Sequence, residues 1–249
     1  MTQFIDLSVP VSARGHLRRM PEIQYWDHKT YAELRAPQIG LKSGYLRDWG
    51  FLAMENISMT PHEGTHLDAP WHFSPISEGK PAKTIDQIPL EWCFSDGVVL
   101  DFHDFDRERP ILIGDLEKAL NKISYKLKPF DIVLIRTDAT KHWLEEGYED
   151  IGAGFTAEST IWLIDQGIKI MGKDTWTWDQ PFDVMRKRNQ PERFLEAHFI
   201  GHRKEYCHIE NLANLDKIPK PFGFKVSVFP VKIERASAGW VRAVAIINN

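Results

Sequence analysis

The middle of the chain alternates between strand-like and helix-like patterns of apolar residues. Short apolar runs at 97–102, 131–136 and 168–171 predict buried strands. Apolar side chains at helical spacing predict a helix at 115–123. A threonine N-cap and a glycine stop predict a second helix at 157–166. This βαβαβ order predicts that part of the sheet is parallel.

The two ends of the chain predict additional β structure. Residues 226–229 and 241–247 have strand-like patterns with no helix between them, and 4–9 is a strand candidate at the start. An irregular stretch then continues to about residue 50, and long loops of this kind are often lids or subunit contacts. There is no internal repeat or flexible linker. We therefore expect one α/β domain with a mixed sheet over residues 1–249.

The composition is that of an ordinary globular protein and excludes several classes of partner. The 249 residues are 43% hydrophobic and 27% charged, and the net charge of −4 comes from mixed acidic and basic residues. That balance argues against binding to nucleic acid or to an anionic membrane. Neither a signal segment nor an apolar run of about 18 residues is present. The two cysteines form no CxxC pattern. We expect a cytoplasmic protein that acts on a small molecule.

Four potential metal ligands share one short segment, 62–72, which reads HEGTHLDAPWH. Its three histidines and its aspartate stand at even spacings, so an extended chain would place all four on one face. A straight strand would hold the outer two roughly 33 Å apart, and the glycine and proline between them permit the necessary bend. The four residues are His62, His66, Asp68 and His72.

Imidazole and carboxylate groups in this pattern predict a catalytic metal site. They suit Zn²⁺, Mn²⁺ or Fe²⁺, and a metal ion can lower the pKa of water from 15.7 to about 7. A general acid/base is also needed, and His72, at the far end of the segment, is the candidate. The alternative is a group of hydrogen-bonded histidines without a metal. His198 and Glu210 form a second patch whose spacing alone is weak support for a ligand role.

These two patches together resemble the cyclase-like family of metal-dependent hydrolases, which includes bacterial kynurenine formamidase and isatin hydrolase. Residues 62–72 are similar to its HxGTHxDxPxH motif, and the resemblance runs from 5–10 to 242–245. It implies a swivelling β/β/α architecture, a homodimer or homotetramer, and one or two zinc or manganese ions. It also implies site roles: His62, His66 and Asp68 for a first metal, His198 and Glu210 for a second, and His72 as acid/base.

Two details within this resemblance bear on metal number and substrate. Isatin-hydrolase-like members have Gln where this chain has Glu210, so Glu210 favours the two-metal form, with Asp68 and Glu210 able to bridge. The Trp-Pro-Gly-Asp segment of formamidase-like members has no counterpart around 20–28, which leaves the substrate open. Candidate substrate contacts are Trp26, Trp71, Trp176 and His202, with core, interface or surface positions as the alternative.

The sequence therefore predicts hydrolysis of a C–N or C–O bond in a small aryl or cyclic amide or ester by metal-activated water. No Gly-x-Ser-x-Gly elbow, dinucleotide fingerprint or P-loop competes with this interpretation. Two alternatives stay open. One is a cyclase or lyase that stabilises an enolate without consuming water, and the other is a non-catalytic metal-binding protein.

Overall fold

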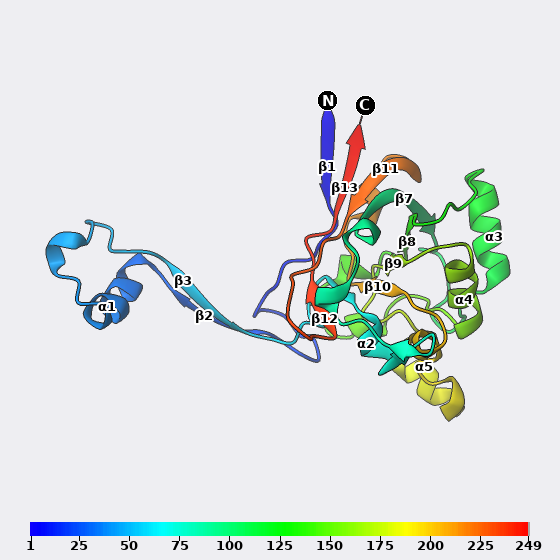
Figure 1. Cartoon of the computed structure of the whole chain (residues 1–249), viewed down its shortest axis with the longest axis horizontal. Coiled ribbons are helices and arrows are strands. Elements are labelled where there is room, and N and C mark those ends of the chain that lie inside the picture. The colour runs from blue at the N-terminus through cyan, green and yellow to red at the C-terminus, as the bar shows by residue number, and fades with distance from the viewer. Residues whose placement is uncertain (249) are drawn as a thin grey trace.

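A nine-stranded mixed sheet forms the body of the protein, in the order β1-β13-β11-β7-β8-β9-β10-β4-β12 (Figure 1). The computed structural model describes residues 1–248. The strands are β1 (Thr2–Asp6), β2 (Glu22–Trp26), β3 (Met54–Ser58), β4 (His66–Asp68), β5 (Ile76–Ser77), β6 (Lys80–Pro81), β7 (Phe94–Asp101), β8 (Ile132–Arg136), β9 (Ile170–Lys173), β10 (Cys207–Glu210), β11 (Phe222–Ser227), β12 (Ala238–Trp240) and β13 (Val244–Asn248). The helices are α1 (His28–Gln38), α2 (Pro70–Phe73), α3 (Ile113–Lys122), α4 (Ala157–Asp165), α5 (Phe182–Lys187) and α6 (Glu196–Phe199).

The centre of the sheet is parallel and its two flanks are antiparallel. β7, β8, β9 and β10 run parallel to one another, with α3 between β7 and β8 and α4 between β8 and β9 in the chain. β1, β13 and β11 form one antiparallel flank, and β4 and β12 form the other. The predicted βαβαβ unit and mixed sheet are therefore confirmed. Thr156 accepts a hydrogen bond from the backbone N–H of Ser159 and so caps α4.

Alternation along the central strands divides the core between the two faces of the sheet. In β8, Ile132 and Leu134 belong to one buried cluster, together with side chains of the antiparallel flanks. Val133 and Ile135 face the other way and pack with Leu116 of α3 and Leu163 of α4. Because both faces are covered, the parallel strands read as continuous apolar runs, not as alternating ones.

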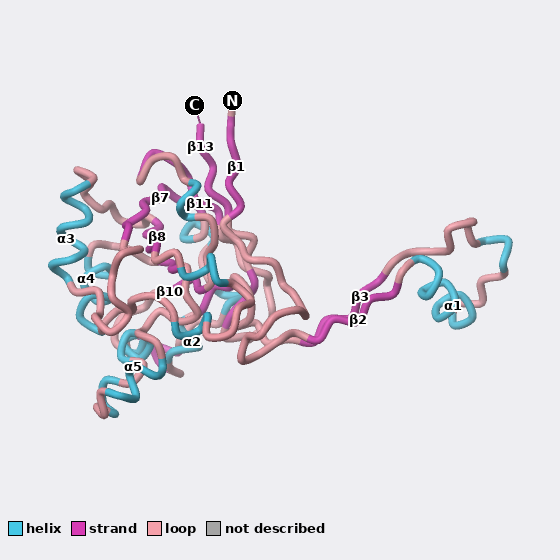
Figure 2. Tube along the Cα trace, turned by 180° about the vertical axis from the view of Figure 1, so that it is seen from behind, coloured by secondary structure: helices cyan, strands magenta, loops and turns pink. Residues whose placement is uncertain are grey.

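An arm formed by residues 22–58 projects from this body (Figures 1 and 2). β2 and β3 pair as an antiparallel hairpin, and α1 lies beyond them at the tip. Asp27 caps α1 by accepting hydrogen bonds from the backbone N–H groups of Lys29 and Thr30. The expectation of an irregular chain here is wrong. The two arm strands are mostly exposed on both faces, so their sequence lacks the alternation by which a half-buried strand is recognised.

Two further features of the described residues concern cysteine pairing and membrane-spanning helices. The thiols of Cys93 and Cys207 are both buried and free, so neither forms a disulfide. Among residues 1–248, no helix is both long enough and apolar enough to cross a membrane.

Candidate metal centre

The segment 62–72 adopts three conformations in turn and so brings its ligands together. Gly64 has a φ of +69° and turns the chain into β4, a conformation that glycine adopts without strain. β4 lies between β10 and β12 and holds His66 and Asp68 on one face. Pro70 then begins α2, which carries His72. The predicted bend is present, but His72 stands on a helical turn and not on an extended chain.

Asp68 lies at the middle of the histidine cluster and is fully buried. Its Oδ1 is 2.8 Å from Nδ1 of His62 and 3.4 Å from Nε2 of His66. Its Oδ2 is 3.1 Å from Nε2 of His208 and 3.8 Å from Nε2 of His72. The two oxygens of this one carboxylate therefore face two different sets of imidazoles.

Glu210 of β10 repeats this arrangement from the neighbouring strand. Its Oε2 is 3.6 Å from Nε2 of His66. Its Oε1 is 3.3 Å from Nε2 of His208 and 3.7 Å from Nε2 of His198. The backbone N–H of Trp178 donates a hydrogen bond of 2.9 Å to the same Oε1 and fixes the carboxylate.

Two ligand groups can be defined within the cluster, each with its ligand atoms within 4.8 Å of one another. Both include Asp68, which explains how one aspartate could serve two ions. The inner group is entirely buried, whereas the outer group reaches the surface of the protein. The inner group is Asp68, His198, His208 and Glu210, and the outer group is His62, Asp68 and His72.

Most of these histidines have one ring nitrogen bonded to the protein and the other directed at the carboxylates. His66 bonds the carbonyl oxygen of Gly64 through Nδ1, and His198 bonds Asp179 through Nδ1. The same holds for His62, through Ser237, and for His208, through Tyr206. Such outer hydrogen bonds are typical of metal-ligating histidines. Among the described residues, the imidazole of His72 makes no hydrogen bond of this kind.

The pKa values in the cluster follow from burial and from mutual attraction. Burial opposes the charged forms, yet His72 and His66 hold the pKa of Asp68 well below its usual range. Burial also disfavours the imidazolium of His66, but the carboxylates of Asp68 and Glu210 outweigh it and raise its pKa to about 9. For His72, burial dominates over the attraction of Asp68 and lowers the pKa to about 4. At neutral pH His72 is therefore neutral and able to accept a proton.

The unpaired polar atoms of the cluster fit a divalent metal ion. Nε2 of His66, Nε2 of His208 and both carboxylate oxygens of Asp68 are buried without a hydrogen-bond partner. Buried polar groups normally have partners, and a group of them that converges on one place needs an explanation such as an ion. Imidazole nitrogens and carboxylate oxygens are ligands that Zn²⁺ and Mn²⁺ accept.

His208 is a residue that the sequence analysis did not assign. It is fully buried on β10, two positions before Glu210. Since alternate residues of a strand share a face, the predicted role of Glu210 carried a signal for His208 as well.

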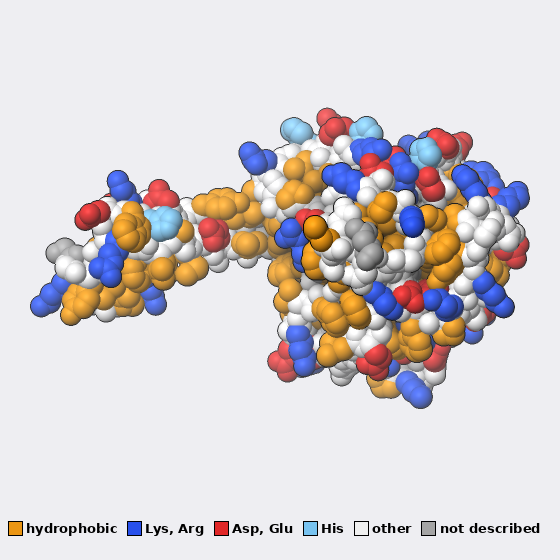
Figure 3. Space-filling model, turned by 90° about the horizontal axis from the view of Figure 1, so that it is seen from above, with side chains coloured by type: hydrophobic (Ala, Val, Ile, Leu, Met, Phe, Trp, Pro, Cys, Tyr) orange, Lys and Arg blue, Asp and Glu red, His pale blue; other side chains and the backbone are white. Residues whose placement is uncertain are grey.

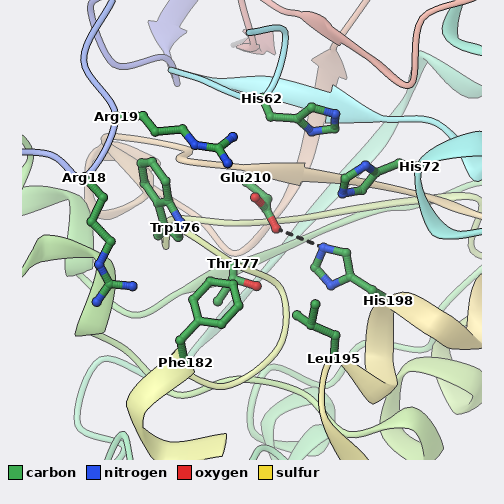
Figure 4. Close-up of a pocket in the computed structure, with 10 residues that line it drawn as sticks. All are labelled: Arg18, Arg19, His62, His72, Trp176, Thr177, Phe182, Leu195, His198 and Glu210. Carbon is green, nitrogen blue, oxygen red and sulfur yellow. Dashed lines mark ion pairs between the residues drawn. The ribbon is translucent and has the colours of Figure 1, made fainter. Parts of the chain in front are cut away.

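A cavity of about 360 Å³ opens beside the cluster (Figure 4). Its metal-site side presents His62, His72, His198 and Glu210. Arg18 also lines the cavity, and its guanidinium donates hydrogen bonds to both carboxylate oxygens of Asp150. The remaining lining residues are Arg19, Trp176, Thr177, Phe182 and Leu195.

The four candidate substrate contacts lie in different places. Trp176 lines the cavity. Trp26 is on β2 of the arm, and Trp71 is an exposed residue of α2. His202 bonds the hydroxyl of Ser74 at 3.0 Å through Nδ1. Only Trp176 among these four is part of the cavity wall described above.

Comparison with known proteins identifies the family. The family model described as "Putative cyclase" matches residues 5–180, which include the whole segment 62–72. The chain belongs to the cyclase family. Two of its cyclase-family relatives are hydrolases by name. Kynurenine formamidase of Bordetella avium (strain 197N) is 25% identical over 228 residues, which are 88% of this chain and 96% of the relative. Isatin hydrolase of Roseibium aggregatum is 26% identical over 214 residues, 82% and 79% of the two chains.

Solved structures of cyclase-family proteins share the fold. Isatin hydrolase A from Ralstonia solanacearum superposes with a TM-score of 0.77 at 21% identity and covers 99% of this chain and 92% of its own. An isatin hydrolase bound to the product analogue thioisatinate gives 0.76 at 21% identity, with 100% and 93% covered. The expected cyclase-like architecture is thereby confirmed.

Proposed function

We propose that this protein is a metal-dependent hydrolase that cleaves a C–N or C–O bond of a small aryl or cyclic amide or ester. The observation that carries this proposal is the convergence of buried, unpaired imidazole and carboxylate atoms from β4 and β10 beside an open cavity. The names of the two relatives support hydrolysis of an amide next to an aromatic ring. Zinc and manganese both suit the donor atoms.

The residues of the proposed site fall into two groups, the metal ligands and the general acid/base. A divalent ion held here would polarise the substrate carbonyl and lower the pKa of water. His62, His66, Asp68, His198 and Glu210 are the proposed ligands. His72 faces the cavity, lacks the outer hydrogen bond of the other histidines, and is neutral at neutral pH. Its neutral form can accept a proton from water and, once protonated, pass it to the leaving group.

The opposite wall of the cavity supports an aromatic substrate. Trp176 and Phe182 offer flat apolar surfaces across from the metal-site histidines (Figure 4). The guanidinium of Arg19 also extends into this space, and no ion pair of Arg19 is present among the described residues. An aryl ring that carries a polar or anionic substituent would match both features.

Two measurements test the proposal. Elemental analysis of gently purified wild-type protein should find bound zinc or manganese, and Glu210→Gln should reduce two ions per chain to one. A panel of formanilides, lactams and lactones should then be tested in water labelled with ¹⁸O. Label in the product supports hydrolysis, whereas turnover without label would mean cyclase or lyase chemistry. Protein that takes up no metal, even after reloading, would contradict the central claim.

We also propose that the chain assembles with copies of itself through the arm. Exposed apolar side chains gather on the arm, which Figure 3 shows projecting from the body. Apolar surface of this kind is typical of protein interfaces. The residues concerned include Tyr25, Tyr45, Trp49, Leu52, Met54 and Ile57.

A further inference from the structure

Hydrogen bonding within the protein accounts for one ring nitrogen of His208 and not for the other. The hydroxyl of Tyr206 donates to the carbonyl oxygen of Ala197 at 2.7 Å, so toward His208 it acts as an acceptor. Nδ1 of His208 lies 3.3 Å from that hydroxyl oxygen and is thus the ring nitrogen that carries the proton. The lone pair of a neutral His208 would therefore be on Nε2.

Nε2 of His208 faces the carboxylates of Asp68 and Glu210. It lies 3.1 Å from Oδ2 of Asp68 and 3.3 Å from Oε1 of Glu210, and it has no hydrogen-bond partner of good geometry. A lone pair that faces two negatively charged oxygens in a buried site is unfavourable. Either a proton or a metal cation must lie between these three atoms.

The spacing of the ligand atoms favours a metal ion. Four ligands about 2.0–2.2 Å from a tetrahedral Zn²⁺ stand roughly 3.3–3.6 Å from one another. The inner group has separations of 3.1, 3.3 and 3.7 Å, the last from Nε2 of His198 to Oε1 of Glu210. Without His208 the group has three protein ligands, and with it the group has four.

We propose that His208 is a metal ligand and that it closes the inner position with four protein side chains. This inference rests on the proposed metal-dependent function and assigns different roles to the inner and outer metal positions. A tetrahedral site with four protein ligands has no place for substrate, as in structural zinc sites. An ion held there would keep Asp68 and Glu210 in place and would leave the reaction to the outer group, whose His62 and His72 also line the cavity.

Competition with a chelator of known affinity tests this proposal, with Zn²⁺ as the probe and without any substrate. Wild-type protein should release its two ions in two phases, the inner one last. His208→Phe should lose the slow phase, with at least a tenfold weaker affinity for that ion. His103→Phe, which removes an exposed histidine paired with Asp101, is the matched control and should behave as wild type. Loading with Co²⁺ gives a second readout, because its absorption spectrum reports loss of the four-coordinate ion.

The outcomes separate this inference from the function on which it rests. If wild-type protein binds no ion, the proposed function itself fails. If wild type binds two ions and His208→Phe retains both with unchanged affinity, His208 is not a ligand and the inference is overturned. Should His208→Phe not fold, Tyr206→Phe decides, since it keeps the imidazole and removes only the acceptor at Nδ1. An outer partner of this kind is worth about 10- to 100-fold in metal affinity, so unchanged affinity in Tyr206→Phe would also count against the proposal.

Discussion

Asp179 accepts a hydrogen bond of 2.5 Å from Nδ1 of His198, and the same carboxylate also accepts the backbone N–H of His198 at 3.0 Å. One buried side chain thus fixes both the position of α6 and the direction of the imidazole that α6 carries. The adjacent residue, Trp178, holds Glu210 through its backbone N–H. The loop before α5 therefore orients two of the proposed ligands without contacting the metal position itself.

Asp179→Asn should weaken metal binding while leaving the ligands in place. An amide can still accept through its oxygen, but it lacks the charge that orients and strengthens the His198 imidazole as a ligand. We expect a loss of about 10- to 100-fold in affinity for one of the two ions, measured by chelator competition. Asp183→Asn is the control, since Asp183 pairs with Arg107 away from the cluster. Equal metal affinity in both variants would contradict this role of Asp179.

His72→Ala should abolish most of the activity but keep the metal. General acid/base catalysis contributes about 10²- to 10⁴-fold, so kcat should fall by that order on any good substrate. Metal content by elemental analysis should stay at the wild-type value, because the imidazole lacks the outer hydrogen bond found at the other four histidines. If an ion is lost together with the activity, His72 is a ligand of the outer group and not the acid/base.

Arg19→Gln should weaken binding of aryl ligands that carry a carboxylate. The guanidinium extends into the cavity from an exposed segment, and exposed ion pairs contribute about 0.2–1 kcal/mol. We expect the inhibition constant of benzoate to rise up to about fivefold at low salt, with little change for a neutral benzamide. Arg14→Gln, in the same segment but outside the cavity wall, is the charge-matched control. Equal effects of the two variants would assign Arg19 to general surface charge.

Lys173 predicts a pH dependence of stability. It is fully buried, and its Nζ donates to the carbonyl oxygens of Ala153 and Trp178, both at 3.0 Å. Burial lowers its pKa from 10.5 to about 7. Between these values the unfolded chain binds more protons than the folded one, so the contribution of Lys173 to the free energy of unfolding rises with pH over this window and is lost as pH falls through 7.

The comparison of Lys173→Met with Lys220→Met isolates this contribution. Lys220 is exposed, so its replacement leaves the buried Lys173 side chain in place. Denaturant unfolding at several pH values between about 7 and 10 should show a smaller rise of stability with pH in Lys173→Met than in the control. Parallel curves for the two variants would mean that Lys173 does not titrate in this window.

Substitution of the arm tip tests assembly. Trp49 and Leu52 are 62% and 58% exposed, so their replacement by Ser should not disturb the core of the body. We expect the double variant to have a lower molar mass than wild type in sedimentation velocity at the same concentration. Leu90→Ser, which changes an equally exposed apolar residue of the body, should leave the mass unchanged. A monomeric wild type would contradict the proposal.

Local patterns were sufficient to predict the centre of the fold and the chemistry of one segment. The apolar runs that became β8 and β9 are recognisable because both faces of these strands are buried. The turn at Gly64 and the shared face of His66 and Asp68 also follow from spacing. These features depend on neighbours along the chain, which the sequence lists directly.

The parts that were missed depend on contacts between distant segments. Asp179 matters only because folding brings it against His198, and no spacing rule connects this pair. The arm was missed for the opposite reason. Its strands bury neither face, so the period of two that identifies a strand is absent.

That same arm ties the folding of one chain to the presence of another. A two-stranded hairpin is marginally stable in water when it packs against nothing, and here β2 and β3 pair mainly with each other. In an assembly of the kind proposed, the free energy that keeps α1 and this hairpin folded comes from a second molecule. The unfolding midpoint should then rise with protein concentration, by mass action, while the nine-stranded sheet melts independently of dilution.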